Sequence, residues 1–300
     1  MTEPYPKLLI VRNLVAPIAS AREVVTAIRA DVHAGLAATL THGAFVMAVA
    51  AVEVALVDSL MYYLRHFPKK LPKEARPIAI DALPTDVVHF IEKAAERFVR
   101  DLAYKSLPGF FDRYLKLLSI PATAELADAV ALVQEIKATR NVLLHNRGIS
   151  NDLYVAQAGS KRRAEYEGAK LSVDVAYVHS SADALCTVLD NLAVALASKY
   201  SSYTKVAAHR TLWGYVFDSP IMLYDDFWLV DEAADKIVAM KEGASEASIS
   251  SSERLFLGVW RAHFNGRGDY LKDLHMRRFD KDNLRKFHFM LAIARAFPWS

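Results

Sequence analysis

Apolar residues recur at helical spacing along most of this chain. A repeat of three or four positions is typical of α-helices that bury one side, so the sequence predicts a mainly α-helical fold. Residues 1–16 are expected to form a short strand or an extended arm, and Ser20 is expected to cap the first helix, with Glu23 as its capping-box partner. Helices are predicted at about 20–33, 41–66, 86–105, 110–117, 124–145, 174–203, 226–242, 252–264 and 281–297.

One region departs from the helical pattern. Residues 151–157 contain Leu153-Tyr154-Val155, and apolar residues alternate with polar ones over 170–175. The two stretches flank the polar turn 159–163. Strands that alternate around a turn of this kind predict a small β-hairpin after the helix at 124–145.

The helix at 41–66 is the most apolar part of the chain. Ala44, Ala48, Ala51 and Ala55 would let neighbouring helices approach closely, in the core or at a protomer interface, and the core is the expected place. A membrane span needs about 18 or more apolar residues, and charged residues interrupt this run. No secretion signal is evident at the N-terminus, so we expect a cytoplasmic protein with no membrane partner.

Composition agrees with a globular protein. The chain has 300 residues, 53% hydrophobic and 24% charged, which fits one large domain or two ordinary ones. All four tryptophans, Trp213, Trp228, Trp260 and Trp299, lie in the last third. We therefore expect a helical domain at 1–203 and a helical C-terminal region of unknown role at 204–300.

Several kinds of chemistry have no support in the sequence. The net charge of +3 is too small to indicate a nucleic-acid partner by itself. The single cysteine, Cys186, excludes an internal disulfide and is expected to be a small core residue. No metal-ligand, phosphate-loop or nucleophile-elbow motif is present, and we expect neither a metal nor another cofactor.

The stretch from Arg140 to Asn151 is the strongest candidate for a functional site. On a helical wheel, Leu132, Ile136 and Leu143 lie on one side of an apolar arc and Leu126, Val133 and Leu144 on the other, with Arg140 between them. An arginine at such a position needs a partner or an opening. Asn141 and His145 lie one turn apart on the neighbouring edge, and Gly148 supplies the freedom that ends a helix.

An Arg-Asn-x-x-x-His motif at the end of a long helix resembles the HEPN superfamily. Its signature is an arginine a few residues before a histidine, commonly with a polar residue after the arginine. Arg140 and His145 enclose four residues, and Asn141 takes the polar position. The continuation through Asn146 and Arg147 to Tyr154 is similar to that of defence-linked HEPN proteins. The resemblance covers residues 20–203, and implies a HEPN-like helical bundle.

The resemblance implies a metal-independent endoribonuclease. A histidine can act as acid or base near neutral pH, and an arginine can bind two phosphate oxygens while charge builds in the transition state. Arg140, His145 and Asn141 are then the candidate catalytic residues, with Glu53, Asn146 and Tyr154 as supporting residues. Glu53 is the expected partner for Arg140. The basic residues expected to hold the RNA backbone are Lys161, Arg162, Arg163 and Arg147.

HEPN ribonucleases dimerise so that both copies of the motif line one cleft, and the resemblance therefore implies a homodimer. It also implies a prokaryotic toxin–antitoxin or antiphage setting, with an antitoxin or defence-system protein as a partner. Two other interpretations stay open. One is a non-catalytic HEPN module that binds nucleic acid or a partner protein, and the other is an unrelated helical protein in which the motif is a coincidence.

Overall fold

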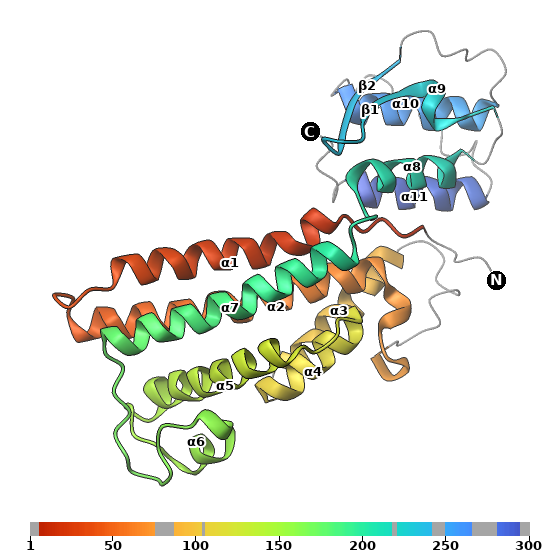
Figure 1. Cartoon of the computed structure of the whole chain (residues 1–300). Coiled ribbons are helices and arrows are strands. Elements are labelled where there is room, and N and C mark those ends of the chain that lie inside the picture. Colours follow the sequence, from red (N-terminus) through yellow and green to blue (C-terminus); the bar gives the residue numbers. More distant parts are fainter. Residues whose placement is uncertain are drawn as a thin grey trace.

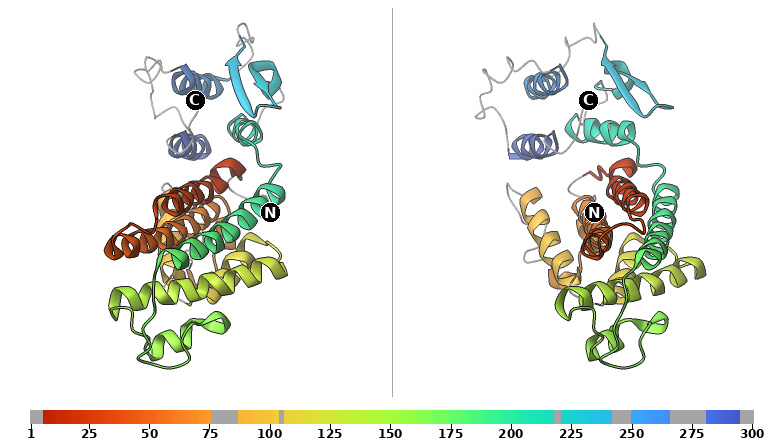
Figure 2. Two further views of the ribbon diagram at one scale, coloured as in Figure 1. Left: turned by 60° about the vertical axis from the view of Figure 1, so that its left-hand side comes forward. Right: turned by 90° about the vertical axis from the view of Figure 1, so that its left-hand side faces the viewer.

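A computed structural model describes residues 6–75, 87–103, 106–217, 221–241, 250–265 and 281–294. This part of the chain is mainly helical, as the sequence predicts, with one small antiparallel sheet (Figure 1). The first part of the chain forms a bundle of long helices, and the C-terminal region lies at one end of it. Figure 2 shows the same separation from two further directions.

The bundle is built on three helices that contact one another along their lengths. α1 and α2 form a hairpin, and α7 packs against both. α5 and α3 add to this group, and α4 packs against α5. The bounds are α1 Val11–Asp31, α2 Ala38–His66, α3 Val87–Ala103, α4 Leu107–Leu118, α5 Ala124–His145 and α7 Val175–Lys199, with short 3₁₀ turns η1 Pro68–Lys70 and η2 Lys73–Ala75.

The predicted start of the first helix was wrong. α1 begins at Val11 rather than Ser20, and Pro17 lies inside it. Ser20 and Glu23 are exposed residues of the helix and form no capping box. Burial explains the longer helix, because Leu14 and Ile18 are buried and extend the apolar face past the proline. The remaining bundle helices agree with prediction to within a few residues, and the predicted ends at 86, 105 and 297 lie outside the described residues.

The small residues of α2 pack in the core, as expected. Ala48 and Ala55 are buried, and Ala44 and Ala51 pack against the same cluster of apolar side chains. The hydroxyl of Ser59, also buried in α2, donates to the Leu14 carbonyl of α1. Close approach of α1 and α2 follows from these small side chains.

The β-hairpin predicted after the motif helix is absent from the described residues. Residues 152–157 form a short helix, α6 Asp152–Gln157, and a single antiparallel bridge joins Ile149 to Lys170. The side chain of Asn151 accepts a hydrogen bond from the Tyr154 backbone N–H and so caps α6. This cap outweighs the strand preference of Leu153, Tyr154 and Val155. A 3₁₀ turn follows at Gly159–Lys161 (η4).

The antiparallel sheet lies in the C-terminal region instead. It pairs β1 Trp228–Asp231 with β2 Lys236–Met240, so the helix predicted at 226–242 was wrong. Between the strands, Asp231 accepts from the Ala234 N–H, and Asp235 adopts a positive φ of 49°. These aspartates favour a turn. The helices here are α8 Lys205–Val216, α9 Tyr224–Phe227, α10 Ser251–Asn265 and α11 Lys281–Ala294.

Among the described residues, a small cluster of buried apolar side chains lies between α5 and the loop that follows it, apart from two larger cores. One fills the bundle, and the other gathers aromatic side chains of the C-terminal region, including Trp213, Trp228 and Trp260. The extended N-terminal segment contributes to both. Leu9 belongs to the bundle core, whereas Leu8 and Ile10 belong to the C-terminal core. Trp299 lies outside the described residues.

Two helices, α2 and α7, are long and apolar enough to cross a membrane by length and composition alone. Half of the α2 window and 39% of the α7 window are buried inside the protein. The buried core helix of a soluble protein passes the same test. These two helices are therefore weak evidence for a membrane protein, and the expected cytoplasmic location stays a prediction.

Candidate functional site

The motif helix α5 ends where the sequence predicts. The Thr123 side chain accepts from the Leu126 N–H at its start, and the last helical residue is His145. Arg147 and Gly148 then take positive φ angles of 52° and 75°, and the Gly148 N–H donates to the Val142 carbonyl. This left-handed turn ends the helix and sends the chain into α6. The end lies away from the C-terminal region (Figure 1).

α5 is buried on two sides rather than one. Its first half packs into the bundle through Leu126, Ala129, Val133 and Ile136. Its second half packs against the following loop through Glu135, Ala138, Thr139 and Val142. The predicted apolar arc was wrong at two positions, because Leu132 and Leu144 are exposed. The prediction that Arg140 lies within this arc is confirmed, because Arg140 is on the same side of α5 as Val133 and Ile136.

Arg140 has the partner that the sequence predicts. One terminal nitrogen of the guanidinium donates to the Glu53 carboxylate of α2. The other donates to the side-chain oxygen of Asn141 at 2.9 Å. The Nε of Arg140 is buried and has no hydrogen-bond partner among the residues that the structure describes. Because the side chain of Arg140 is 17% exposed and that of Glu53 28%, solvent reaches the pair only in part.

Lys137 is a further cation in this cluster. Its Nζ lies 2.9 Å from the second Glu53 carboxylate oxygen, and its side chain is 21% exposed. Lys137 and Arg140 thus share one carboxylate, and the three side chains together carry one net positive charge. The sequence analysis missed Lys137. Its position one turn before Arg140 on the same helix was the available signal.

His145 is exposed at the end of the same helix. It lies one turn beyond Asn141 but about 140° around the helix from Arg140. Asn141 therefore stands between the arginine and the histidine, with its oxygen bound to Arg140. Within the described residues, the arrangement supplies a partly shielded guanidinium and an exposed imidazole at one helix end.

Two of the expected supporting residues have local structural roles. The Asn146 side-chain amide donates to the Ile149 carbonyl at 2.5 Å and stabilises the turn. Tyr154 is buried, and its hydroxyl donates to Glu135. The structure therefore places Tyr154 on the loop side of α5 rather than beside Glu53 and Arg140. Arg147 is exposed in the turn, beside His145 in sequence.

The three basic residues of the turn at 161–163 all form ion pairs within the chain. Lys161 pairs with Asp128 at 2.9 Å, and Arg162 pairs with Glu165. Both pairs are exposed enough for solvent to weaken them. Arg163 differs, because its Nε donates to the buried carboxylate of Glu135 at 3.0 Å. Of the three, Lys161 and Arg162 remain accessible for an RNA backbone.

Glu135 is the centre of a buried hydrogen-bond network that the sequence analysis missed. Its carboxylate accepts from Thr139, Tyr154, Tyr177 and Arg163. The Arg163 guanidinium also lies 3.7 Å from the centre of the Tyr177 ring. Burial raises the pKa of Tyr177, and the nearby carboxylate raises it further. The network fastens the loop and α7 to α5, and so holds the helix end that carries His145.

No cluster of three or more metal-ligating side chains occurs among the residues that the structure describes. No family model, curated protein or solved structure matches the chain. The HEPN resemblance therefore rests on the motif, its place at the end of α5, and the helical bundle that carries it.

Proposed function

We propose that the chain is a metal-independent endoribonuclease of the HEPN type. The observation that supports this most is the cluster of Arg140, Lys137 and Glu53. A permanently charged guanidinium lies on the bundle-facing side of α5, where packing alone would favour an apolar residue. It is held by a carboxylate from another helix and stays within reach of solvent. The exposed His145 lies at the end of the same helix.

The proposed reaction transfers a phosphate from the 5′-oxygen to the neighbouring 2′-oxygen of RNA. The 2′-hydroxyl loses its proton and forms a bond to phosphorus, while the bond from phosphorus to the 5′-oxygen breaks. His145 exchanges the protons as general acid or base, so the leaving oxygen departs as a hydroxyl. Arg140 and Lys137 stabilise the charge on the phosphate oxygens. The products are a 2′,3′-cyclic phosphate and a 5′-hydroxyl.

The same proposal includes a homodimer that brings two motifs together. α2 presents three exposed apolar side chains at intervals of seven residues: Leu40 at 60%, Met47 at 63% and Val54 at 57% exposure. This spacing places them on one side of the helix, and Val54 follows Glu53 directly. A second copy on this stripe would cover it and lie beside the cluster. The resemblance adds a toxin–antitoxin or antiphage setting with an antitoxin or defence-system partner.

A non-catalytic module that binds nucleic acid or a partner protein is the second candidate. One observation favours it: Glu53 already pairs with both Arg140 and Lys137 in the single chain, which leaves less of their charge to stabilise a transition state. In that case the helix end would bind a ligand without cleaving it.

The experiment compares purified full-length proteins on total RNA and on tRNA in the presence of EDTA. The variants are Arg140→Ala, His145→Ala and Lys137→Ala, with Arg29→Ala as the control because Arg29 is an exposed arginine of α1 paired with Asp183. We expect His145→Ala to lower the cleavage rate about 10²- to 10⁴-fold. Loss of Arg140 or Lys137 should lower it about tenfold or more. Cleaved ends are identified as 5′-hydroxyls by direct labelling with polynucleotide kinase.

Equal cleavage by the wild type and by both motif variants would refute the proposed site. Binding of RNA without cleavage, lost in Arg140→Ala, would favour the non-catalytic module. Sedimentation of the wild type beside Met47→Asp tests the dimer, because a charge in the stripe should shift the equilibrium to monomer.

A further inference from the structure

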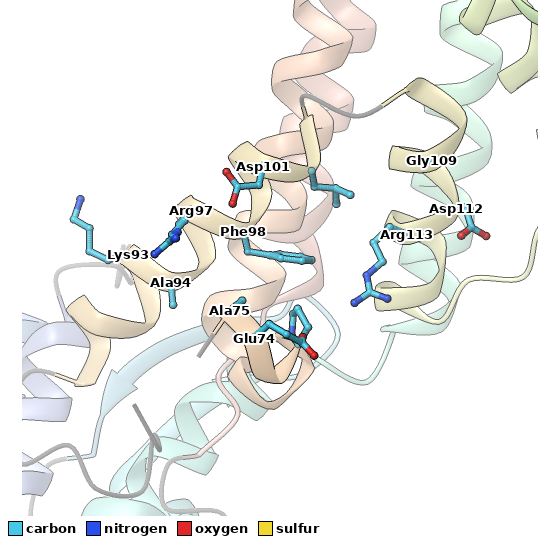
Figure 3. Close-up of a pocket in the computed structure, with 12 residues that line it drawn as sticks. Glu74, Ala75, Lys93, Ala94, Arg97, Phe98, Asp101, Gly109, Asp112 and Arg113 are labelled. Atoms are coloured by element: carbon cyan, nitrogen blue, oxygen red, sulfur yellow. The ribbon is translucent and has the colours of Figure 1, made fainter. Parts of the chain in front are cut away.

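A cavity of about 790 Å³ lies between η2, α3 and α4, apart from the end of α5. Figure 3 shows its lining from these three elements. Small-molecule sites commonly have volumes of about 300–1,000 Å³ and a mostly apolar lining with a few polar groups. The apolar part here includes Phe98, Leu102 and Ala94 of α3.

The charged residues of the cavity fall into two groups. Lys93 pairs with Glu96 at 2.9 Å, and Asp112 pairs with Lys116 at 2.9 Å, so these two are already neutralised. Arg97 and Arg113 have no ion-pair partner among the described residues, and neither have Glu74 and Asp101. Arg97, Glu74 and Asp101 are exposed, whereas Arg113 is half-buried. Arg113 is therefore the charged group best placed to bind a ligand inside the cavity.

Phe98 and Arg113 meet inside the cavity. Figure 3 shows Phe98 projecting from α3 and Arg113 from α4 into the space between the helices. The guanidinium carbon of Arg113 lies 5.9 Å from the centre of the Phe98 ring. Both side chains are half-buried, so each keeps part of its surface open to the cavity. An aromatic face beside a guanidinium suits a flat ring that carries a negative group.

We propose that this cavity binds a small organic anion in which a flat ring is joined to a phosphate or a carboxylate. The ring packs on Phe98 and Leu102, and the anionic group binds Arg113. Glu74 and Asp101 accept hydrogen bonds from hydroxyl or amino groups of the same ligand. This site does not depend on the ribonuclease activity, and its lining shares no residue with the cluster on α5.

The mixed lining determines which parts of a ligand bind. Because Arg113 is only half-buried, solvent weakens its ion pair with a bare anion, which gains little from the cavity. A ring without a charge leaves Arg113 unpaired. The complete ligand satisfies both, so it binds more tightly than either part alone.

The experiment uses isothermal titration calorimetry on the full chain. Two probes carry a ring and an anion: adenosine monophosphate for a phosphate and indole-3-acetate for a carboxylate. Adenosine and inorganic phosphate represent the separate parts. We expect Arg113→Ala to weaken the probe that binds about tenfold to a hundredfold. Phe98→Leu weakens the ring probes and leaves phosphate unchanged.

Arg100→Ala is the matched control, since Arg100 is an exposed arginine of α3 outside the cavity lining. Circular dichroism verifies that each variant is folded. Binding of either complete probe that Arg113→Ala weakens and Arg100→Ala preserves supports the site, and the stronger probe identifies the anion. Failure of both complete probes at millimolar concentration, or equal binding by Arg113→Ala, overturns it.

Discussion

His209 has no exposed surface, and both of its ring nitrogens are hydrogen-bonded. Nε2 accepts from the indole N–H of Trp260 at 3.0 Å, which assigns the ring proton to Nδ1. Nδ1 lies 2.8 Å from the Tyr224 hydroxyl and donates to it. Burial, with a smaller contribution from the charge of Lys205, lowers the pKa of His209 to about 3. The histidine is therefore a neutral part of the C-terminal core.

This burial predicts a stability that depends on pH. In the unfolded chain His209 binds a proton below about pH 6.5, whereas in the folded chain it does so only below about 3. The unfolded state therefore binds more protons between these values, and the free energy of unfolding falls as the pH falls through this window. His66, whose pKa burial lowers to about 4, contributes in the same direction within the bundle.

Urea unfolding at pH 7, 5.5 and 4 measures the effect. The unfolding is monitored by the tryptophan fluorescence of the C-terminal region. His209→Gln should reduce the pH dependence. An unchanged slope in His209→Gln would contradict the assignment of this histidine.

At the residue scale the sequence predicts the partner of Arg140 but not the cluster around it. An arginine among apolar residues demands a carboxylate, and Glu53 interrupts the most apolar helix, so physical reasoning could join the two. Lys137 and Glu135 carry no comparable signal, because a charged residue on a helix is usually exposed. The loop and α7, both packed against α5, make Glu135 a buried residue.

Helix α5 is held between the bundle and the loop, and Glu135 is the main polar contact on the loop side. Glu135→Ala should lower the free energy of unfolding by about 3 to 5 kcal/mol, because it leaves three hydroxyl groups and the Nε of Arg163 without their acceptor. Urea unfolding measures the loss, and limited proteolysis within 159–170 shows whether the loop is released.

Glu165→Ala is the control for this prediction. Its carboxylate pairs with Arg162 at the surface, and its removal should change the free energy of unfolding by less than about 1 kcal/mol. Equal stability of the two variants would show that the network around Glu135 contributes little.

At the element scale the long helices are predictable and the short elements are not. α2, α5 and α7 repeat their apolar positions over many turns, and capping residues mark several ends. In contrast, the segments 151–157 and 226–242 are too short or too mixed in composition for the spacing of apolar residues to distinguish a helix from a strand. At 151–157 one asparagine cap selects a helix, and at 228–240 a turn with two aspartates selects a hairpin.

At the scale of the described molecule, the bundle and the C-terminal region each have a large apolar core, and one short segment belongs to both. Leu8 and Ile10 should each contribute about 2 to 5 kcal/mol to the C-terminal core, since truncation to alanine leaves a cavity. Leu9→Ala should weaken the bundle instead. Hydrogen exchange measured peptide by peptide separates the two effects.

Val24→Ala, on the exposed side of α1, should leave exchange unchanged in both regions. If Leu8→Ala and Leu9→Ala accelerated exchange over the same peptides, the division into two cores would be contradicted. The sequence predicts a boundary near 204 from the tryptophans, and this division into domains stays a prediction. It does not predict the bridging role of residues 8–10, because a short apolar run gives no information about its partners.

Because residues 8–10 contribute to both cores, they affect how the two halves of the protein can be expressed separately. A fragment that begins at residue 204 lacks two side chains of its own core, and a fragment that ends at 203 leaves those two side chains exposed to water. Each half expressed alone would expose apolar surface that is buried in the full chain, and would tend to aggregate. Grafting residues 6–10 onto the C-terminal half through a flexible tether would repair that half.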